Sequence, residues 1–193
     1  MRSKVWNLKK FFPILIAASI FIVMLVAQMS IHGSSSSASK LNISAEMVQA
    51  YEANFSEITL TTTKSSVLNL SKVKQPIVIL NFWASWCRPC ISEFKTLKQL
   101  VSKYGGEKLL VLGVNNDTDD QLKLIQSTED KLKLNFESVA DIEGKITSKF
   151  FINEIPASIV YYKGRVIHFK NSEFDFMSKS FIELLDSKLS EVK

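Results

Sequence analysis

The middle of the chain alternates between short apolar runs and longer segments in which apolar residues recur at helical spacing. The run 77–83 (Ile-Val-Ile-Leu-Asn-Phe-Trp) is short and rich in β-branched and aromatic residues, which predicts a buried strand. The segment 87–104 has helical spacing and is followed by Gly105-Gly106, which predicts a helix that stops there. A strand therefore passes almost directly into a helix N-terminus near residue 87.

Similar patterns predict the other elements. Strands are expected at 57–62, 66–70, 108–114, 136–140, 157–162 and 166–170, and helices at 45–54, 118–131, 145–151 and 175–189. The helix 118–131 is expected because Leu122, Ile125 and Leu132 recur at helical spacing. Alternating strands and helices, closed by a hairpin and a helix, predict an α/β fold of three layers with a mixed central sheet flanked by helices.

The longest apolar stretch, residues 11–29, carries no charge. As a helix these 19 residues would be ~28 Å long, close to the hydrocarbon thickness of a bilayer. A cleaved signal peptide and a buried core helix are the alternatives. The apolar core of a signal peptide is shorter, however, and the best small-residue site, Ser36-Ser37-Ala38, lies well beyond Met29. We predict an uncleaved transmembrane signal-anchor over 11–29.

The charge of the chain is concentrated at its N-terminus. The net charge is +5, and residues 1–10 contribute four basic side chains and no acidic one, which leaves +1 (5 − 4) for residues 11–193. The positive-inside rule then keeps residues 1–10 in the cytoplasm as a basic tail and exports the rest. A Ser-rich linker is expected at 30–44 and a folded domain at 45–193. The nearly neutral domain argues against nucleic acid as a partner.

The chain contains only two cysteines, and they stand two residues apart in Trp86-Cys87-Arg88-Pro89-Cys90. Unpaired N–H groups and the positive end of the dipole at a helix N-terminus stabilise a thiolate. A structural zinc site would need two further ligands at suitable spacing. A structural disulfide across a two-residue gap would stabilise the fold little. The pattern favours a redox-active dithiol that needs no metal and no other cofactor.

Residues 80–94 (LNFWASWCRPCISEF) resemble the active-site segment of the membrane-anchored, extracytoplasmic thioredoxin-like proteins of the TlpA/ResA type. The resemblance continues through 111–117, 141–144 and 155–166, and covers roughly residues 45–192. It implies a thioredoxin-like fold with an N-terminal strand extension. It also implies a single-pass protein of the bacterial cytoplasmic membrane whose catalytic domain lies on the extracytoplasmic (periplasmic) side.

The resemblance implies a role for each residue around the cysteine pair. Cys87 is the expected attacking thiol, Cys90 the resolving thiol, and Pro156 a cis-proline that faces them. Glu93 is the candidate for proton transfer, because Asn81 stands where cytosolic thioredoxins have a buried Asp; a solvated helix-face glutamate is the alternative. Contacts with the substrate protein are expected from Trp86, Arg88, Pro89 and Ile155.

The activity implied by the resemblance is thiol–disulfide exchange that reduces disulfides in exported proteins, including those of apocytochrome c. Electrons would come from a membrane thiol transporter of the CcdA or DsbD kind. A disulfide-forming oxidase remains open, because the direction depends on the reduction potential and the partners. A copper-delivery protein of the Sco type also remains open, although that family has a C-x-x-x-C pair and a hairpin histidine, for which His168 is the match. A peroxiredoxin-type peroxidase is disfavoured because Ala84 replaces the activating threonine.

Overall fold

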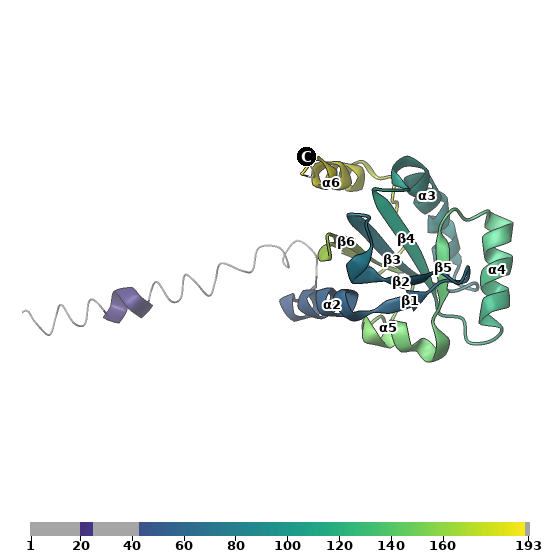
Figure 1. Ribbon diagram of the computed structural model, residues 1–193, viewed down its shortest axis with the longest axis horizontal. Coiled ribbons are helices and arrows are strands. Elements are labelled where there is room, and N and C mark those ends of the chain that lie inside the picture. The colour runs from purple at the N-terminus through teal and green to yellow at the C-terminus, as the bar shows by residue number, and fades with distance from the viewer. Residues whose placement is uncertain (1–19, 25–42, 192–193) are drawn as a thin grey trace, which may run out of the picture. The chain divides into compact units, whose positions relative to one another are not determined.

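The computed structural model describes residues 20–24 and 43–191 (Figure 1). Residues 20–24 are helical, and the rest of the predicted anchor over 11–29 lies outside the described residues, as do the predicted tail 1–10 and most of the linker 30–44. Among the residues that the structure describes, no helix is both long and apolar enough to cross a membrane.

Residues 43–191 fold around a five-stranded mixed sheet with the strand order β5-β4-β3-β6-β7. Strand β3 runs parallel to β4 and antiparallel to β6, and β4 runs parallel to β5. The strands of this sheet are β3 (Ile77–Trp83), β4 (Leu109–Asn115), β5 (Glu137–Ala140), β6 (Ala157–Tyr162) and β7 (Arg165–Lys170). A separate antiparallel pair is formed by β1 (Thr59–Thr61) and β2 (Val67–Asn69).

Helices cover both faces of the sheet, as Figure 1 shows. The helices are α2 (Ala45–Glu57), α3 (Arg88–Tyr104), α4 (Gln121–Leu132), α5 (Lys145–Lys149) and α6 (Lys179–Ser190), with short 3-10 turns η3 (Leu70–Lys72) and η4 (Ile142–Gly144). One hydrophobic core lies under α3, α4 and α6, and a second lies under α2 and α5. The predicted three-layer α/β architecture is confirmed, as is the N-terminal pair of strands.

The two cores are divided by the alternation of side chains along β3, which is fully buried. Ile77 and Ile79 belong to the core under α3, whereas Val78 and Leu80 belong to the core under α2. The same alternation turns Asn81 toward α3. An uncharged polar residue is thereby placed in the middle of the sheet, under the helix that follows the cysteines.

Trp83 is fully buried at the end of β3 and packs edge-on against Phe94 of α3, with 5.2 Å between ring centroids. Gly113 of β4 makes room for it, because a Cβ at that position would lie 2.8 Å from the Trp83 indole nitrogen. The packing fixes the end of β3, from which the chain enters the cysteine loop.

Two helices begin later than predicted. Helix α4 starts at Gln121 rather than at residue 118, because Asp120 adopts a left-handed backbone conformation (φ 44°). Helix α6 starts at Lys179 rather than at residue 175, because Ser178 before it has a non-helical backbone (φ −56°, ψ 141°). Of the residues at helical spacing in α4, Ile125 is fully buried, whereas Leu122 in the first turn is 63% exposed.

Candidate active site

The two cysteines lie at the start of α3 and form a disulfide, with their Cα atoms 5.3 Å apart. Cys87 is the N-cap of the helix, and its sulfur accepts a hydrogen bond from the backbone N–H of Cys90 at 3.3 Å. The sulfur therefore lies where a helix N-terminus offers free N–H groups and positive dipole charge. In the reduced protein the same position favours a thiolate at Cys87.

Little of the cysteine pair is exposed to solvent. Cys87 is 4% exposed and Cys90 is fully buried, while Trp86 beside them is 70% exposed. Arg88 and Pro89, which separate the cysteines, are also exposed. An incoming disulfide would approach Cys87 across a surface made of these three flanking residues.

The predicted cis-proline lies at the same edge of the sheet as the cysteines. The Ile155–Pro156 peptide bond is cis, and Ala157, directly after it, is paired with Phe82 near the end of β3. Pro156 is buried and Ile155 is partly buried. The structure thus brings residues 155–156 to the end of β3, from which the cysteine loop departs.

Glu93 is 3% exposed, so the alternative of a solvated glutamate is wrong. Its carboxylate accepts a hydrogen bond from the Asn81 side-chain amide at 2.6 Å and another from the backbone N–H of Phe174 at 3.1 Å. The Asn81 amide also donates to the Ser158 hydroxyl at 2.9 Å. Asn81 and Ser158 are partners on adjacent strands, so the register of the sheet lets the Asn81 amide bridge Ser158 and Glu93.

Burial raises the pKa of Glu93 from 4.5 to about 7, despite the opposing effect of the hydrogen bonds from Asn81 and Phe174. The nearby charge of Glu173 raises the pKa further. Glu93 lies three residues after Cys90, so the two side chains are neighbours on the helix. A carboxyl group with this pKa can accept or release a proton near neutral pH.

A second buried carboxylate, Asp117, holds the loop before the cysteines. It accepts hydrogen bonds from the backbone N–H of Ser85 at 3.0 Å and from the Ser85 hydroxyl at 3.0 Å. The Asn115 side chain donates to it at 2.8 Å and accepts from its backbone N–H at 3.1 Å. No role for Asp117 was predicted from the sequence. The contact with Ser85 joins residues far apart in the chain, and local spacing carries no signal for it.

A family model described as the AhpC/TSA family matches residues 52–170, which is more than half of the chain and includes both cysteines, Glu93 and Pro156. The chain belongs to the AhpC/TSA family.

Individual relatives of this AhpC/TSA chain agree with the resemblance found in the sequence. It is 32% identical over 115 residues to the thioredoxin-like protein YneN of Bacillus subtilis, covering 59% of this chain and 65% of YneN. It is 26% identical over 109 residues to the thiol-disulfide oxidoreductase ResA of Bacillus cereus, covering 56% of this chain and 62% of ResA. The chain thus spans just under two thirds of the length of these curated relatives. The predicted resemblance to ResA-type proteins is confirmed.

Solved structures establish the fold of this AhpC/TSA domain as thioredoxin-like. A secreted Mycobacterium tuberculosis disulfide oxidoreductase, described as homologous to Escherichia coli DsbE, superposes with a TM-score of 0.58 at 22% identity. The superposition covers 69% of this chain and 98% of that one. The thioredoxin-like fold expected from the sequence is therefore confirmed.

His168, the candidate copper ligand, lies on β7 of the AhpC/TSA domain within a cluster of aromatic rings. Its ring centroid is 4.9 Å from that of Phe174 and 5.3 Å from that of Phe181. Burial lowers the pKa of His168, which favours the neutral ring. Within residues 20–24 and 43–191, no group of three or more His, Cys, Asp or Glu side chains is placed to hold a metal ion.

Proposed function

We propose that this chain is a thiol–disulfide oxidoreductase that reduces disulfides in exported proteins. The observation that carries the proposal is the disulfide between Cys87 at the N-cap of α3 and Cys90, with the buried carboxyl group of Glu93 one turn further along the helix. A relative with the name thiol-disulfide oxidoreductase supports the same chemistry. Apocytochrome c is the client that the sequence resemblance suggests.

The reaction begins when the Cys87 thiolate attacks one sulfur of the client disulfide. This forms a mixed disulfide and releases the first client sulfur as a thiolate, which takes up a proton. Cys90 then loses its proton to Glu93 and attacks the Cys87 sulfur, which releases the second client sulfur as a thiolate that also takes up a proton. The client gains two electrons and two protons, and the Cys87–Cys90 disulfide is formed. A membrane thiol transporter of the CcdA or DsbD kind is the proposed source of the electrons that reduce it again.

The surface around Cys87 suits a protein client. Trp86 is 70% exposed, and Leu122 and Ile142 are 63% and 66% exposed. Leu122 begins α4 after β4, and Ile142 follows β5, so both lie at the edge of the sheet where the parallel strands end. Of these exposed apolar side chains, Trp86 directly precedes Cys87 and is the one proposed to contact a client held there. Arg88, Pro89 and Ile155 would contribute contacts nearer the sulfur atoms.

The reduction potential of the cysteine pair tests the direction of the reaction. We expect a value near that of thioredoxin, about −270 mV, when the full chain is equilibrated with defined thiol buffers. A value near that of the strong oxidant DsbA, about −120 mV, would make the protein a disulfide-forming oxidase and would overturn the reductase proposal.

We further propose that residues 11–29 anchor the protein in the bacterial cytoplasmic membrane with the domain outside. The uncharged apolar segment of bilayer-spanning length and the basic residues before it support this topology. We expect the full chain, expressed in bacteria, to stay in the membrane fraction after carbonate extraction. Release of a shortened protein into the soluble fraction would instead indicate cleavage of a signal peptide.

A further inference from the structure

Beyond the cysteines, helix α3 presents an unusually cationic outer face. The helix contains Arg88, Lys95, Lys98 and Lys103, and its single acidic residue, Glu93, is buried. The exposed part of α3 therefore carries four positive charges and no negative one. Because residues 11–193 together have a net charge of only +1, this concentration of charge is local.

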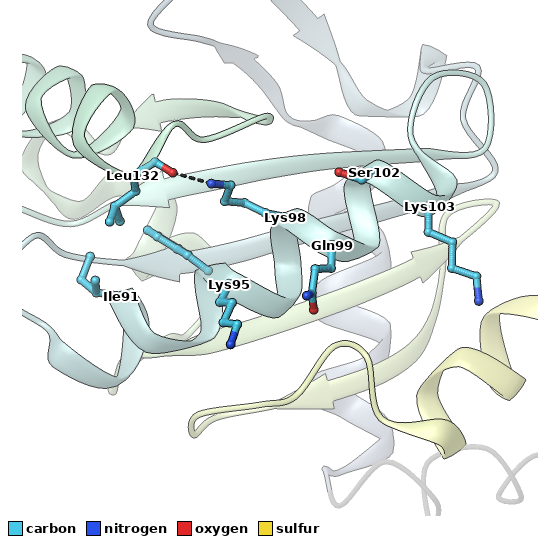
Figure 2. Close-up of a pocket in the computed structure, with 8 residues that line it drawn as sticks. Ile91, Lys95, Lys98, Gln99, Ser102, Lys103 and Leu132 are labelled. Atoms are coloured by element: carbon cyan, nitrogen blue, oxygen red, sulfur yellow. Dashed lines mark hydrogen bonds between the residues drawn. The ribbon is translucent and has the colours of Figure 1, made fainter.

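The lysines of α3 line an open depression of about 690 Å³. Figure 2 shows Lys98 reaching toward Leu132, whose carbonyl accepts its hydrogen bond at 2.5 Å, while Lys95 and Lys103 extend away from Leu132. Buried Phe94 and partly buried Ile91 and Leu132 supply apolar surface. We name this surface the α3 strip, which consists of Ile91, Phe94, Lys95, Lys98, Gln99, Ser102, Lys103 and Leu132.

Like Lys64, Lys72 and several other lysines of residues 43–191, the lysines of the α3 strip have no carboxylate within 4.0 Å. Five other exposed or partly exposed cations of residues 43–191 do lie within 4.0 Å of a carboxylate. The five pairs are Lys145–Glu143, Lys149–Glu57, Arg165–Glu52, Lys179–Glu183 and Lys188–Glu191. Three positive groups beside apolar surface, without internal counter-charges, are complementary to an acidic partner that also has apolar side chains.

The α3 strip begins beside the redox site, since Ile91 directly follows Cys90. At 1.5 Å per residue, Lys95, Lys98 and Lys103 lie about 12, 17 and 24 Å along the helix from Cys87. An extended chain covers these distances in about four to seven residues. A client held at Cys87 in a mixed disulfide therefore has its own flanking residues within reach of the strip.

We propose that the α3 strip binds an acidic segment of the client, located about four to seven residues from the client cysteine. This inference rests on the proposed reductase function and adds a substrate class to it. An anionic membrane surface offers similar charge, but a flat bilayer lying on α3 would also cover the approach to Cys87. A peptide segment occupies the strip without that conflict.

The test compares disulfide-containing peptides that differ only in their flanking residues. One peptide carries Glu at positions four to seven on both sides of its disulfide, and the other carries Gln there. With the prereduced full chain at low salt, we expect the Glu peptide to be reduced roughly three- to tenfold faster, and we expect added salt to diminish this preference.

Lysine variants test whether the preference for the Glu peptide depends on the α3 strip. Lys95→Gln combined with Lys98→Gln should remove it, and Lys95→Gln alone, which breaks no hydrogen bond, should reduce it. Lys64→Gln combined with Lys72→Gln removes the same charge from the β1–β2 region and should leave the preference intact.

The outcomes separate this inference from the proposed function. Equal rates for the two peptides would overturn the α3 strip as a docking site while leaving the reductase proposal standing. Failure to reduce either peptide would overturn both the docking inference and the reductase proposal. If the double variant at Lys95 and Lys98 lost binding to anionic vesicles but kept the peptide preference, the strip would face the membrane and the docking inference would be wrong.

Discussion

Replacement of Cys87 by alanine is expected to lower disulfide reduction to the uncatalysed rate, whereas replacement of Cys90 by alanine should leave the first half of the reaction intact. Cys87 is the N-cap of α3 and receives the backbone N–H of Cys90, so it is the sulfur positioned to ionise and attack. Cys90 is fully buried and can reach only the sulfur of Cys87. The Cys90→Ala variant should therefore accumulate mixed disulfides with client proteins.

Non-reducing electrophoresis and mass spectrometry of the trapped species measure this difference. The Cys87→Ala variant and the variant lacking both cysteines serve as controls, and neither should form mixed disulfides. Accumulation of mixed disulfides through Cys90 in the Cys87→Ala variant would reverse the assignment of attacking and resolving thiols.

The order of strands and helices could be predicted from the sequence because it depends on local patterns. The apolar run 77–83 and the helical spacing after it can both be recognised without knowledge of tertiary contacts. Both elements are present in the structure. Helix starts were less predictable. Asp120 interrupts one expected helix with a left-handed backbone, and the non-helical backbone of Ser178 delays the start of α6.

The site could be predicted only where a motif marks it. Cys87 and Cys90 were found through their spacing at a helix N-terminus, Pro156 through the family resemblance, and Glu93 through its position relative to Cys90 and Asn81. The wider hydrogen-bond network around Glu93 and Asn81 was not found. Ser158 comes from a distant strand and the N–H of Phe174 from a loop, and only the sheet register and the packing of α3 bring them together.

The environment of Glu93 also explains why glutamine should fit there. The Asn81 amide donates to both Glu93 and Ser158, and its own Oδ1 atom is buried without a partner in the described part of the chain. If the Asn81 amide rotates by half a turn, Oδ1 can accept from a protonated Glu93 and from the Ser158 hydroxyl. The same rotation lets Asn81 accept from a glutamine amide, while the glutamine oxygen accepts from Phe174.

Replacement of Glu93 by glutamine is expected to change both stability and the second step of the reaction. The folded-state pKa of about 7 exceeds the ordinary value of 4.5, so the folded protein binds this proton more tightly than the unfolded chain does. The resulting stability is fully present below pH 4.5 and is lost as the pH rises through about 7. The loss amounts to about 3 kcal/mol, and the glutamine variant should not show it.

Chemical unfolding between pH 4 and pH 8 measures the stability difference, with Glu107→Gln, at an exposed site just after α3, as the matched control. In single-turnover experiments, Glu93→Gln should slow resolution of the mixed disulfide on the order of 100-fold, because Cys90 loses its proton acceptor. The wild-type rate should rise with pH through about 7, where Glu93 becomes able to accept that proton. Identical rate profiles for the wild type and the glutamine variant would mean that Glu93 is a buried structural residue and that Cys90 gives its proton to water.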